Sequence, residues 1–330
     1  MADGGINAKL ELLETNVQIM QKGFFWQSSL VKRLAALLHT MEGRTADSYE
    51  IRRSLDLIKR EAGLFSVFRG NMALCIAALL SMSPNPQLML DDAQEAYSLL
   101  KNARFRASDY LAVAAIEIAR HSEPINQLKV VNRARQFYDG MKANRYFSTG
   151  QDDYIYSAML GLSDIDAPSG IERIERLNAN LRGEFWDKNS VQALAQVLVL
   201  GGSDDTAVMR TLDLRDQLKA LGIKPDRAYT LSSLGVLALL PADTDKIAAR
   251  VGDAHTALRA IKGFGAMSVY AQELFLYASA LVACDYADAS GSAINSSLST
   301  GIAGIIIAHQ TAMVAAITAS STAASSSAGH

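Results

Sequence analysis

A two-helix unit recurs along the chain, and this recurrence limits the fold more than any other feature. In its clearest copy a helix ends at Leu100, a short turn carries Phe105, and Ser108 precedes a second helix that is apolar on most faces. The Ser108 hydroxyl can accept a hydrogen bond from a backbone N–H of the first turn, which predicts that Ser108 caps this second helix. Because the second helix has little polar surface, we expect it to be buried on most sides.

Six further copies align on the last apolar residue of their first helix. The seven anchor residues are Met20, Ile58, Leu100, Met141, Leu181, Leu218 and Ile261. Their spacings are 38, 42, 41, 40, 37 and 43 residues, which is the range of helical-hairpin repeats. An aromatic or apolar residue follows each anchor, and in most copies a polar residue then precedes the second helix. These polar residues predict helix caps at Ser28, Asn71, Ser108, Asp152, Asn189 or Ser190, and Ser268.

The recurrence predicts an all-α fold of about seven tandem helical hairpins over residues 1–286. Two arrangements of such hairpins remain open. In a solenoid-like array each hairpin contacts only its neighbours, and a concave surface is left for a partner. In a closed α/α ring the apolar second helices line the inside. We take the open array as the first expectation and the ring as its alternative.

The last part of the chain, residues 287–330, changes to an Ala- and Ser-rich composition. The apolar run Ile294–Ala319 predicts a C-terminal helix that packs on or within the array, and Ser320–His330 reads as a flexible tail. A transmembrane helix needs about 20 mainly apolar residues. Because His309 and Gln310 lie at the centre of this run and no Lys or Arg flanks it, we do not expect it to span a membrane.

The charge balance and the cysteines exclude several classes of protein. With 32 basic and 34 acidic residues the net charge is −2, whereas a general nucleic-acid binder usually has a basic excess. Cys75 and Cys284 lie in apolar helical runs, which predicts buried free thiols rather than a disulfide or a metal site. The N-terminus lacks the basic and apolar regions of a secretory signal, so we expect a cytoplasmic protein.

No motif for a metal or a cofactor is present, and we expect neither. The histidines show no His-x-x-x-His spacing, so a metal site on one helix is not supported. These histidines are His39, His121, His255, His309 and His330. The sequence Gly201-Gly202-Ser203 lacks the Gly-Lys-Ser/Thr ending of a phosphate-binding loop, and a helix stop explains it better.

Acidic pairs occur at Asp91-Asp92, Asp152-Asp153 and Asp204-Asp205, each where a helix is predicted to begin. Paired carboxylates can serve as acid and base or bind a divalent cation. At a helix start, however, a carboxylate also caps N–H groups and interacts favourably with the helix dipole. Capping is therefore our first interpretation of these pairs, and acid–base chemistry is the alternative.

Several polar residues interrupt the apolar second helices: Glu117, Gln192, Gln196 and the pair Gln272-Glu273. A carboxylate in an apolar setting is costly unless it is paired, so it marks a polar network or a site. We expect pairing with an arginine of a neighbouring helix. We assign no catalytic residue, and Glu117, Glu273 and Asp152 are the weak candidates. The turn aromatics Trp26, Trp186 and Tyr154 are expected to fill the core.

The residues of the third unit also suggest a family. Phe105, Ser108-Asp109-Tyr110 and the Ala/Leu-rich helix that follows, with similar turns elsewhere and the Ala/Ser-rich end, resemble an uncharacterised bacterial all-helical family catalogued only as a domain of unknown function. The resemblance implies a soluble helical protein with no assigned chemistry. It supplies no catalytic residues to transfer to this chain.

Two functional hypotheses follow. The first is a cytoplasmic scaffold or binding module that recognises a protein or peptide through the surface of its hairpins. The second is an enzyme in a closed α/α ring, with at least two convergent carboxylates among Glu117, Glu273 and Asp152. The oligomeric state is left open by the sequence.

Overall fold

The computed structural model describes residues 3–63, 66–143, 149–202, 206–227 and 229–290, and no strand occurs within these ranges. The all-α prediction is confirmed. The first helices of the hairpins are α1 (Asp3–Gly23), α3 (Ser48–Glu61), α5 (Pro86–Asn102), α7 (Gln127–Ala143), α9 (Ala167–Leu181), α11 (Thr206–Ala220) and α13 (Thr244–Ala260). The second helices are α2 (Ser29–Met41), α4 (Ala73–Ser81), α6 (Asp109–His121), α8 (Asp153–Leu162), α10 (Lys188–Leu200), α12 (Leu231–Ala238) and α14 (Ala271–Ser290).

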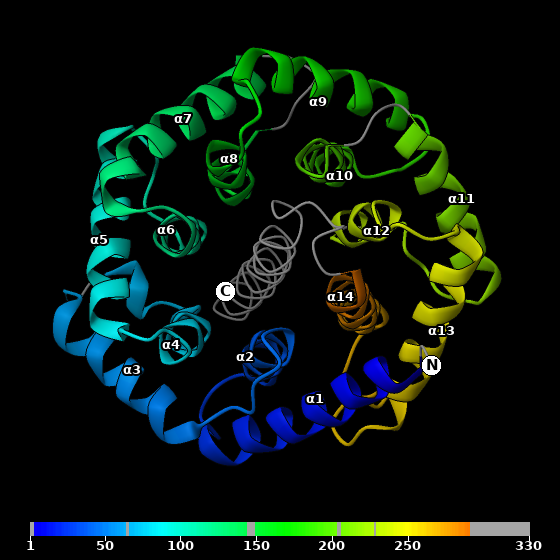
Figure 1. Ribbon diagram of the computed structural model, residues 1–330, viewed down its shortest axis with the longest axis horizontal. Coiled ribbons are helices and arrows are strands. Elements are labelled where there is room, and N and C mark those ends of the chain that lie inside the picture. The colour runs from blue at the N-terminus through cyan, green and yellow to red at the C-terminus, as the bar shows by residue number, and fades with distance from the viewer. Residues whose placement is uncertain (1–2, 64–65, 144–148, 203–205, 228, 291–330) are drawn as a thin grey trace, which may run out of the picture.

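The seven hairpins close into a ring, with the first helices outside and the second helices inside (Figure 1). The last hairpin packs against the first, because α1 contacts both α13 and α14. The expectation of an open array is therefore wrong, and the alternative of a closed ring is what the structure shows. In the ring every hairpin packs against two neighbours. In an open array each end hairpin would have only one neighbour.

A buried ion pair joins the two ends of the ring. Arg33 on α2 donates two hydrogen bonds to Glu273 on α14, from Nε to Oε1 at 2.7 Å and from Nη2 to Oε2 at 3.0 Å. Both side chains are more than nine-tenths buried. A second ion pair links Lys9 on α1 to Asp288 on α14 at 2.5 Å. We call this junction of the first and last hairpins the seam.

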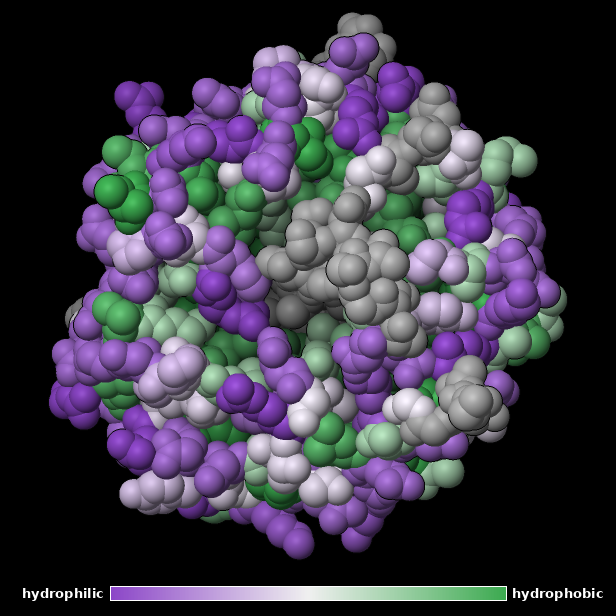
Figure 2. Space-filling model, viewed as in Figure 1, coloured by the Kyte–Doolittle hydropathy of each residue, from purple (hydrophilic) through white to green (hydrophobic). Residues whose placement is uncertain are grey.

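The starts of the inner helices meet, since Asn71 before α4 bonds Asp109 of α6 and Gln192 of α10 bonds Asp153 of α8. The inner helices therefore run in the same direction, and the ring has two different faces. We call the face where the inner helices begin the N-terminal face, and the face where they end the C-terminal face. Neighbouring helices approach closely where small residues meet: a Cβ atom on Gly161 of α8 would lie 2.6 Å from the backbone oxygen of Val130 of α7. Hydrophilic side chains cover much of the rim (Figure 2).

The predicted helix caps are only partly correct. Ser28 and Ser108 cap α2 and α6, accepting hydrogen bonds from Val31 N and Leu111 N at 3.3 and 3.2 Å. For α10 the cap is Asp187 rather than Asn189 or Ser190, because its carboxylate accepts the N–H of both residues. The remaining three predicted caps are wrong: α4 begins after Met72, α14 begins at Ala271, and Asp152 makes no capping hydrogen bond with its side chain.

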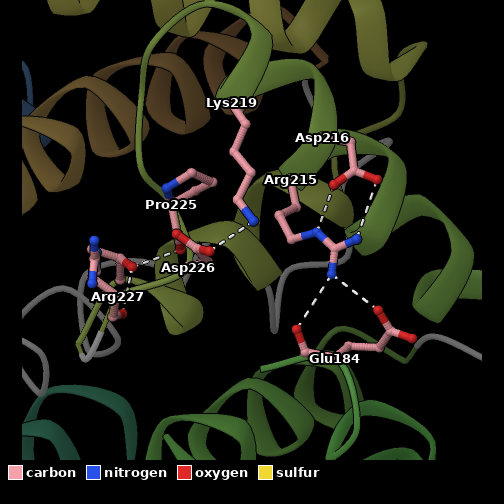
Figure 3. Close-up of polar contacts among 8 residues, drawn as sticks. Glu184, Arg215, Asp216, Lys219, Pro225, Asp226 and Arg227 are labelled. Carbon is pink, nitrogen blue, oxygen red and sulfur yellow. Dashed lines mark hydrogen bonds and ion pairs between the residues drawn. The ribbon is translucent and has the colours of Figure 1, made fainter. Parts of the chain in front are cut away.

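Buried aromatic residues fill the turns of the N-terminal face, as the pattern predicted. The buried turn residues include Phe24, Phe68, Phe105, Phe185 and Phe264. In several turns an arginine of the next outer helix lies over the ring and donates to a turn carbonyl. Arg215, for example, lies 5.5 Å from the centre of the Phe185 ring and bonds the Glu184 carbonyl (Figure 3).

The expectation that turn aromatics fill the core holds for Tyr154 but is wrong for both tryptophans. Tyr154 is buried and packs edge-on against Phe105. Trp26 is 58% exposed and Trp186 is 97% exposed. In each of these turns a neighbouring phenylalanine, Phe24 or Phe185, occupies the space between the helices, which leaves the tryptophan outside.

The described chain ends within α14, which continues past the predicted limit of the array at Tyr286 to Ser290. The predicted helix over Ile294–Ala319 and the tail after it lie outside the described residues, as do Asp204 and Asp205. Within the described ranges, no helix combines the length and the apolar character that crossing a bilayer requires. Cys75 and Cys284 are both free and buried, as predicted.

Candidate functional site

The three candidate acids of the sequence lie in three different places. Glu117 is near the end of α6, at the C-terminal face, whereas Asp152 precedes α8 and Glu273 lies in the first turn of α14, both at the N-terminal face. The inner helices α8 and α14 are separated by α10 and α12 around the ring (Figure 1). The structure therefore does not bring the three candidates together, and each must be judged by its own neighbours.

Glu117 is buried, and both of its carboxylate oxygens contact basic side chains. Its carboxylate lies 3.3 Å from Arg120 Nη1 and 3.4 Å from His121 Nε2, and Arg120 also pairs with Glu42 at the end of α2. Burial alone would raise the pKa of Glu117, but the charges and hydrogen bonds of Arg120 and His121 outweigh it and lower that pKa. The pairing arginine comes from the same helix, not from a neighbouring one as expected.

Glu273 is also paired with an arginine, and this arginine comes from a neighbouring helix. The bidentate contact with Arg33 satisfies both carboxylate oxygens. Burial alone would lower the pKa of Arg33, but the hydrogen bonds and charge of Glu273 raise it. Glu117 and Glu273 are therefore both structural carboxylates, because each is paired with an arginine inside the protein.

Asp153 differs, because its carboxylate is buried among neutral donors. Gln192 Nε2 and Gln196 Nε2, both on α10, donate to Asp153 Oδ1 at 3.0 and 2.8 Å. The backbone N–H of Gly150 donates to Oδ2 at 2.9 Å. Burial, and then the charge of the adjacent Asp152, raise the pKa of Asp153 to about 7 against these three hydrogen bonds.

Tyrosines and a second carboxylate surround Asp153. Tyr110 lies at the start of α6, and its electrostatic neighbours include Asp152, Asp153 and Tyr229. Tyr156 on α8 shares a hydrogen bond of 2.7 Å with Ser232 on α12 and interacts with both aspartates. We call this group the Asp153 cluster, and its members are Tyr110, Asp152, Asp153, Tyr156, Gln192 and Gln196.

Burial raises the pKa values of the other ionisable groups of the cluster as well. The pKa of Asp152 is raised by burial and further by Asp187, although backbone N–H groups oppose this. Burial is the largest cause of the raised pKa values of Tyr110 and Tyr156. The charges of Asp152 and Asp153 raise both further, whereas the hydrogen bond with Ser232 opposes the rise for Tyr156. All of these tyrosines are therefore neutral at pH 7 and can donate a hydrogen bond.

A hydrogen-bonded chain holds Tyr229 beside the cluster. Ser190 Oγ donates to Asp187 Oδ2 at 2.9 Å and accepts from the N–H of Tyr229 at 3.3 Å. Tyr229 has a φ of +69°, in the left-handed region that a bulky residue rarely adopts. Such strained positions concentrate at functional sites, where the surrounding structure maintains them. Burial and the charges of Asp187 and Asp152 raise the pKa of Tyr229, which places its phenol near Asp152.

A pocket on the opposite face, the C-terminal face, is a weaker candidate for a catalytic site. It encloses about 440 Å³ between the ends of α2, α4 and α6 and the start of α5. Its polar lining includes Glu42, Arg44, Asp92, Arg120 and His121. Arg120 and His121 are already paired with glutamates, and Arg44 donates to the carbonyl of Met82 at 2.8 Å. The cationic groups of this pocket thus have partners within the protein.

Unpaired buried atoms distinguish the Asp153 cluster from that pocket. Gln192 and Gln196 are 2% and 0% exposed, and the Oε1 atom of each has no hydrogen-bond partner among the described residues. Native proteins leave few buried polar atoms unpaired, and each one calls for an explanation. Over the described part of the chain, no three acidic, His or Cys side chains come together in a way that could hold a metal ion.

The sequence pointed to the members of this cluster without joining them. Asp152, Gln192 and Gln196 were identified separately, and Asp153 was interpreted as a helix cap. Gln192 and Gln196 lie 39 and 43 positions after Asp153, which is about one hairpin period. Polar residues one period apart lie at the same level of neighbouring inner helices, and this spacing is the signal that could have joined them.

Comparison with known proteins supports the resemblance seen in the sequence. The model of a family described as a protein of unknown function (DUF4003) matches residues 16–312, which is most of the chain. No curated protein and no solved structure matches it.

Proposed function

We propose that this chain, which belongs to the DUF4003 family of unknown function, is an enzyme that performs acid–base chemistry on a small polar substrate at the Asp153 cluster. Its closed ring would serve as a rigid frame that holds side chains from α6, α8 and α10 at fixed positions. Groups held by packed helices keep the precise geometry that catalysis needs better than groups on loops do.

One observation carries the proposal: a buried carboxyl group, held by three neutral donors, has a pKa of about 7. A general acid or base works best when its pKa lies near the operating pH, because it can then both bind and release a proton. Glu117 and Glu273 are paired with cations and lack this property. Asp153 would be the proton-transferring group.

The neighbours of Asp153 have distinct roles in the proposal. Asp152 is only partly buried and would contact the substrate directly as the second carboxylate. Two carboxyl groups in different environments are a usual way to obtain an acid and a base from one residue type. Tyr110 and Tyr156 would donate hydrogen bonds that orient the substrate. Gln192 and Gln196 fix the Asp153 carboxyl and act as positioning residues.

The test compares the wild type with Asp153→Asn, an isosteric variant that cannot transfer a proton. Both are incubated at pH 7 with a metabolite extract, and consumed compounds are identified by mass spectrometry. We expect the wild type to consume specific compounds at a rate on the order of 10²–10⁴ times that of the variant, which is the usual contribution of an acid or base. Asp56→Asn is the matched control, because Asp56 is exposed on α3, far from the cluster, and pairs with Lys59 of the same helix.

A second measurement keeps the proposal falsifiable if no extract contains the substrate. Carbon-13 NMR of aspartate-labelled protein reports each carboxyl pKa, and the signal that Asp153→Asn removes identifies Asp153. A midpoint near 7 supports an acid–base role. A midpoint below about 5 would contradict it, since the group would then stay ionised at neutral pH.

A second candidate function is a scaffold that binds a protein or peptide, and exposed apolar side chains favour it. Phe25 and Trp26 in the turn before α2, and Met267 and Tyr270 in the turn before α14, are each more than half exposed. These two turns are neighbours at the seam, where Gln21 approaches Gly263. Exposed aromatic residues of this kind are typical of binding surfaces. Affinity capture of proteins from a cell lysate, with the wild type and a Trp26→Ser variant as baits, tests this function. If the variant captures every partner that the wild type captures, the scaffold function is contradicted.

We place the protein in the cytoplasm as part of this proposal. Two free thiols with no disulfide between them suit a reducing compartment. Cell fractionation of the full chain tests this placement, and recovery in the membrane pellet or in the medium would contradict it.

A further inference from the structure

We infer that the Asp153 cluster binds a small organic cation, a ligand that carries an ammonium or guanidinium group. This inference rests on the proposed function, because it names the chemical class of the substrate for the same site. The argument comes from the charges around the cluster, from its unpaired atoms and from its aromatic rings.

Carboxylates are the charged groups that act most strongly on the tyrosines in and beside the cluster. The carboxylates that influence Tyr110, Tyr156 and Tyr229 are Asp109, Asp152, Asp153 and Asp187. Asp109 bonds the neutral side chain of Asn71 at 3.2 Å, and Asp187 bonds Ser190. Within the described ranges, none of these four carboxylates forms an ion pair with a Lys or Arg. A bound cation would supply the missing opposite charge.

The unpaired atoms are acceptors. Each glutamine Oε1 belongs to the same amide group as a nitrogen that bonds Asp153, so the two unpaired oxygens lie beside that carboxyl group. A buried unpaired acceptor destabilises the protein by about 1–3 kcal/mol until a donor reaches it. An ammonium offers three N–H donors and a guanidinium five, whereas an anion offers none.

The helix ends oppose a cation, but the carboxylates outweigh them. Helices α6, α8 and α10 each begin at this face, and a helix N-terminus carries roughly half a positive charge. Three such ends amount to about +1.5, while the four carboxylates carry up to −4 and about −3.5 when Asp153 is half protonated. The negative charge of the carboxylates therefore exceeds the positive charge of the three helix ends.

The tyrosines favour an organic cation over a metal ion. A cation within about 6 Å of an aromatic ring is attracted by the face of that ring. Tyr110 and Tyr156 lie near both Asp152 and Asp153, and Tyr229 lies near Asp152. A Ca²⁺ ion, in contrast, needs six to eight oxygen ligands. The described residues provide no group of three acidic, His or Cys side chains for a metal.

Calorimetric titration of the full-length protein tests the inference with probes of equal length and different charge. The probes are butylammonium, 1-butanol and butyrate, with 1,4-diaminobutane, Mg²⁺ and Ca²⁺ as further arms. We expect the two amines to bind at least ten times more tightly than butanol or butyrate at pH 8. We also expect Asp152→Asn to weaken amine binding at least ten-fold, while the matched control Asp56→Asn leaves it unchanged.

Proton release gives a readout that does not depend on turnover. Amine binding ionises Asp153, so titrations near pH 7 in two buffers of different ionisation enthalpy should differ by the heat of a released proton, and this difference should vanish in Asp153→Asn. The titratable groups around this proton are Asp109 and Tyr110 on α6, Tyr138 on α7, Asp152 and Tyr156 at α8, the turn residue Asp187, and Tyr229. Circular dichroism confirms that each variant is folded.

Each outcome decides the inference separately from the proposed function. Equal binding of butanol or butyrate, unchanged amine affinity in Asp152→Asn, or no amine binding at all would overturn the cation inference. The acid–base proposal would then still stand or fall on turnover by Asp153→Asn. Tight binding of Mg²⁺ or Ca²⁺ that Asp152→Asn abolishes, without amine binding, would replace the organic cation with a metal ion.

Discussion

Two buried carboxylates at the N-terminal face of the ring, Glu273 and Asp153, show how neighbours decide the role of an acid. Glu273 at the seam receives both N–H donors of a guanidinium, so its charge is neutralised where it lies. Asp153 receives hydrogen bonds of similar length, but only from amides. The hydrogen-bond geometry is alike and the charge is not. Burial therefore raises the Asp153 pKa to about 7. Asp153 is suited to exchange a proton, whereas Glu273 holds two helices together.

The largest predicted effect removes the cation from the seam. Arg33→Met leaves the buried carboxylate of Glu273 without an opposite charge, and the free energy of unfolding should fall by about 3–5 kcal/mol. Guanidinium denaturation at pH 7 measures it. The double variant Arg33→Met/Glu273→Leu should recover most of the loss, since both charges are then removed. If the single variant loses less than about 1 kcal/mol, the seam pair does not hold the ring closed.

The second prediction concerns pH and Asp153. Its folded-state pKa, about 7, lies above the ordinary value of 3.8, so folding favours the neutral carboxyl. The contribution of the neutral Asp153 carboxyl to the free energy of unfolding is complete below a pH of about 4. It is lost as the pH rises through about 7. Between pH of about 5.5 and about 8 the loss should reach about 2 kcal/mol. Unfolding curves across this range should show the loss in the wild type and not in Asp153→Asn; parallel curves would contradict the raised pKa.

A third change makes the environment of Asp153 still less favourable to charge. Gln196→Leu removes a neutral donor at 2.8 Å and should raise the Asp153 pKa further, by roughly one unit. Carbon-13 NMR of labelled aspartates follows the titration. Gln18→Leu is the control, because Gln18 is an exposed glutamine on α1 that bonds Glu14 of the same helix. A downward shift in Gln196→Leu would mean that the amide does not stabilise the ionised form.

The smallest effect is expected where an arginine–carboxylate pair is exposed. Asp216 lies 2.7 Å from Arg215 Nε, but its side chain is 62% exposed (Figure 3). Asp216→Asn should change the free energy of unfolding by no more than about 0.5 kcal/mol, because water screens such a pair. Arg215 also keeps its contacts with Glu184 and the Phe185 ring. Thermal denaturation measures this, and a loss near that of Arg33→Met would show that exposure does not separate the two pairs.

The sequence was sufficient to predict the hairpins but not their closure. The hairpins follow from local signals, such as the Ser108 cap and the Phe105 turn, which the structure confirms. Closure depends on a small rotation between successive hairpins, and no single residue specifies it. The pair that joins the ends is 240 residues apart, which no local pattern connects. This separation is about six hairpin periods, however, and such multiples indicate which polar residues share a level of the ring.

Adjacent aromatic residues show a second limit of prediction. Phe185 and Trp186 are neighbours in one turn, and both are large enough to fill the space between two helices. Only the backbone direction of the turn decides that Phe185 is buried and Trp186 is exposed. The Asp187 cap is a similar case, since it precedes the predicted Asn189 or Ser190 cap by a few residues. Errors of this size do not change a fold, but they move side chains between core and surface.

Ring closure also sets an order of events during synthesis. Lys9 pairs with Asp288, and the two residues are 279 positions apart, so α1 is made long before its partner exists. At a translation rate of about 5–20 residues per second, the interval is about 15–60 s. Throughout it, the side of α1 that later packs on α13 and α14 has no partner from its own chain. In a nascent chain of this fold, that side of α1 therefore stays uncovered until α14 leaves the ribosome.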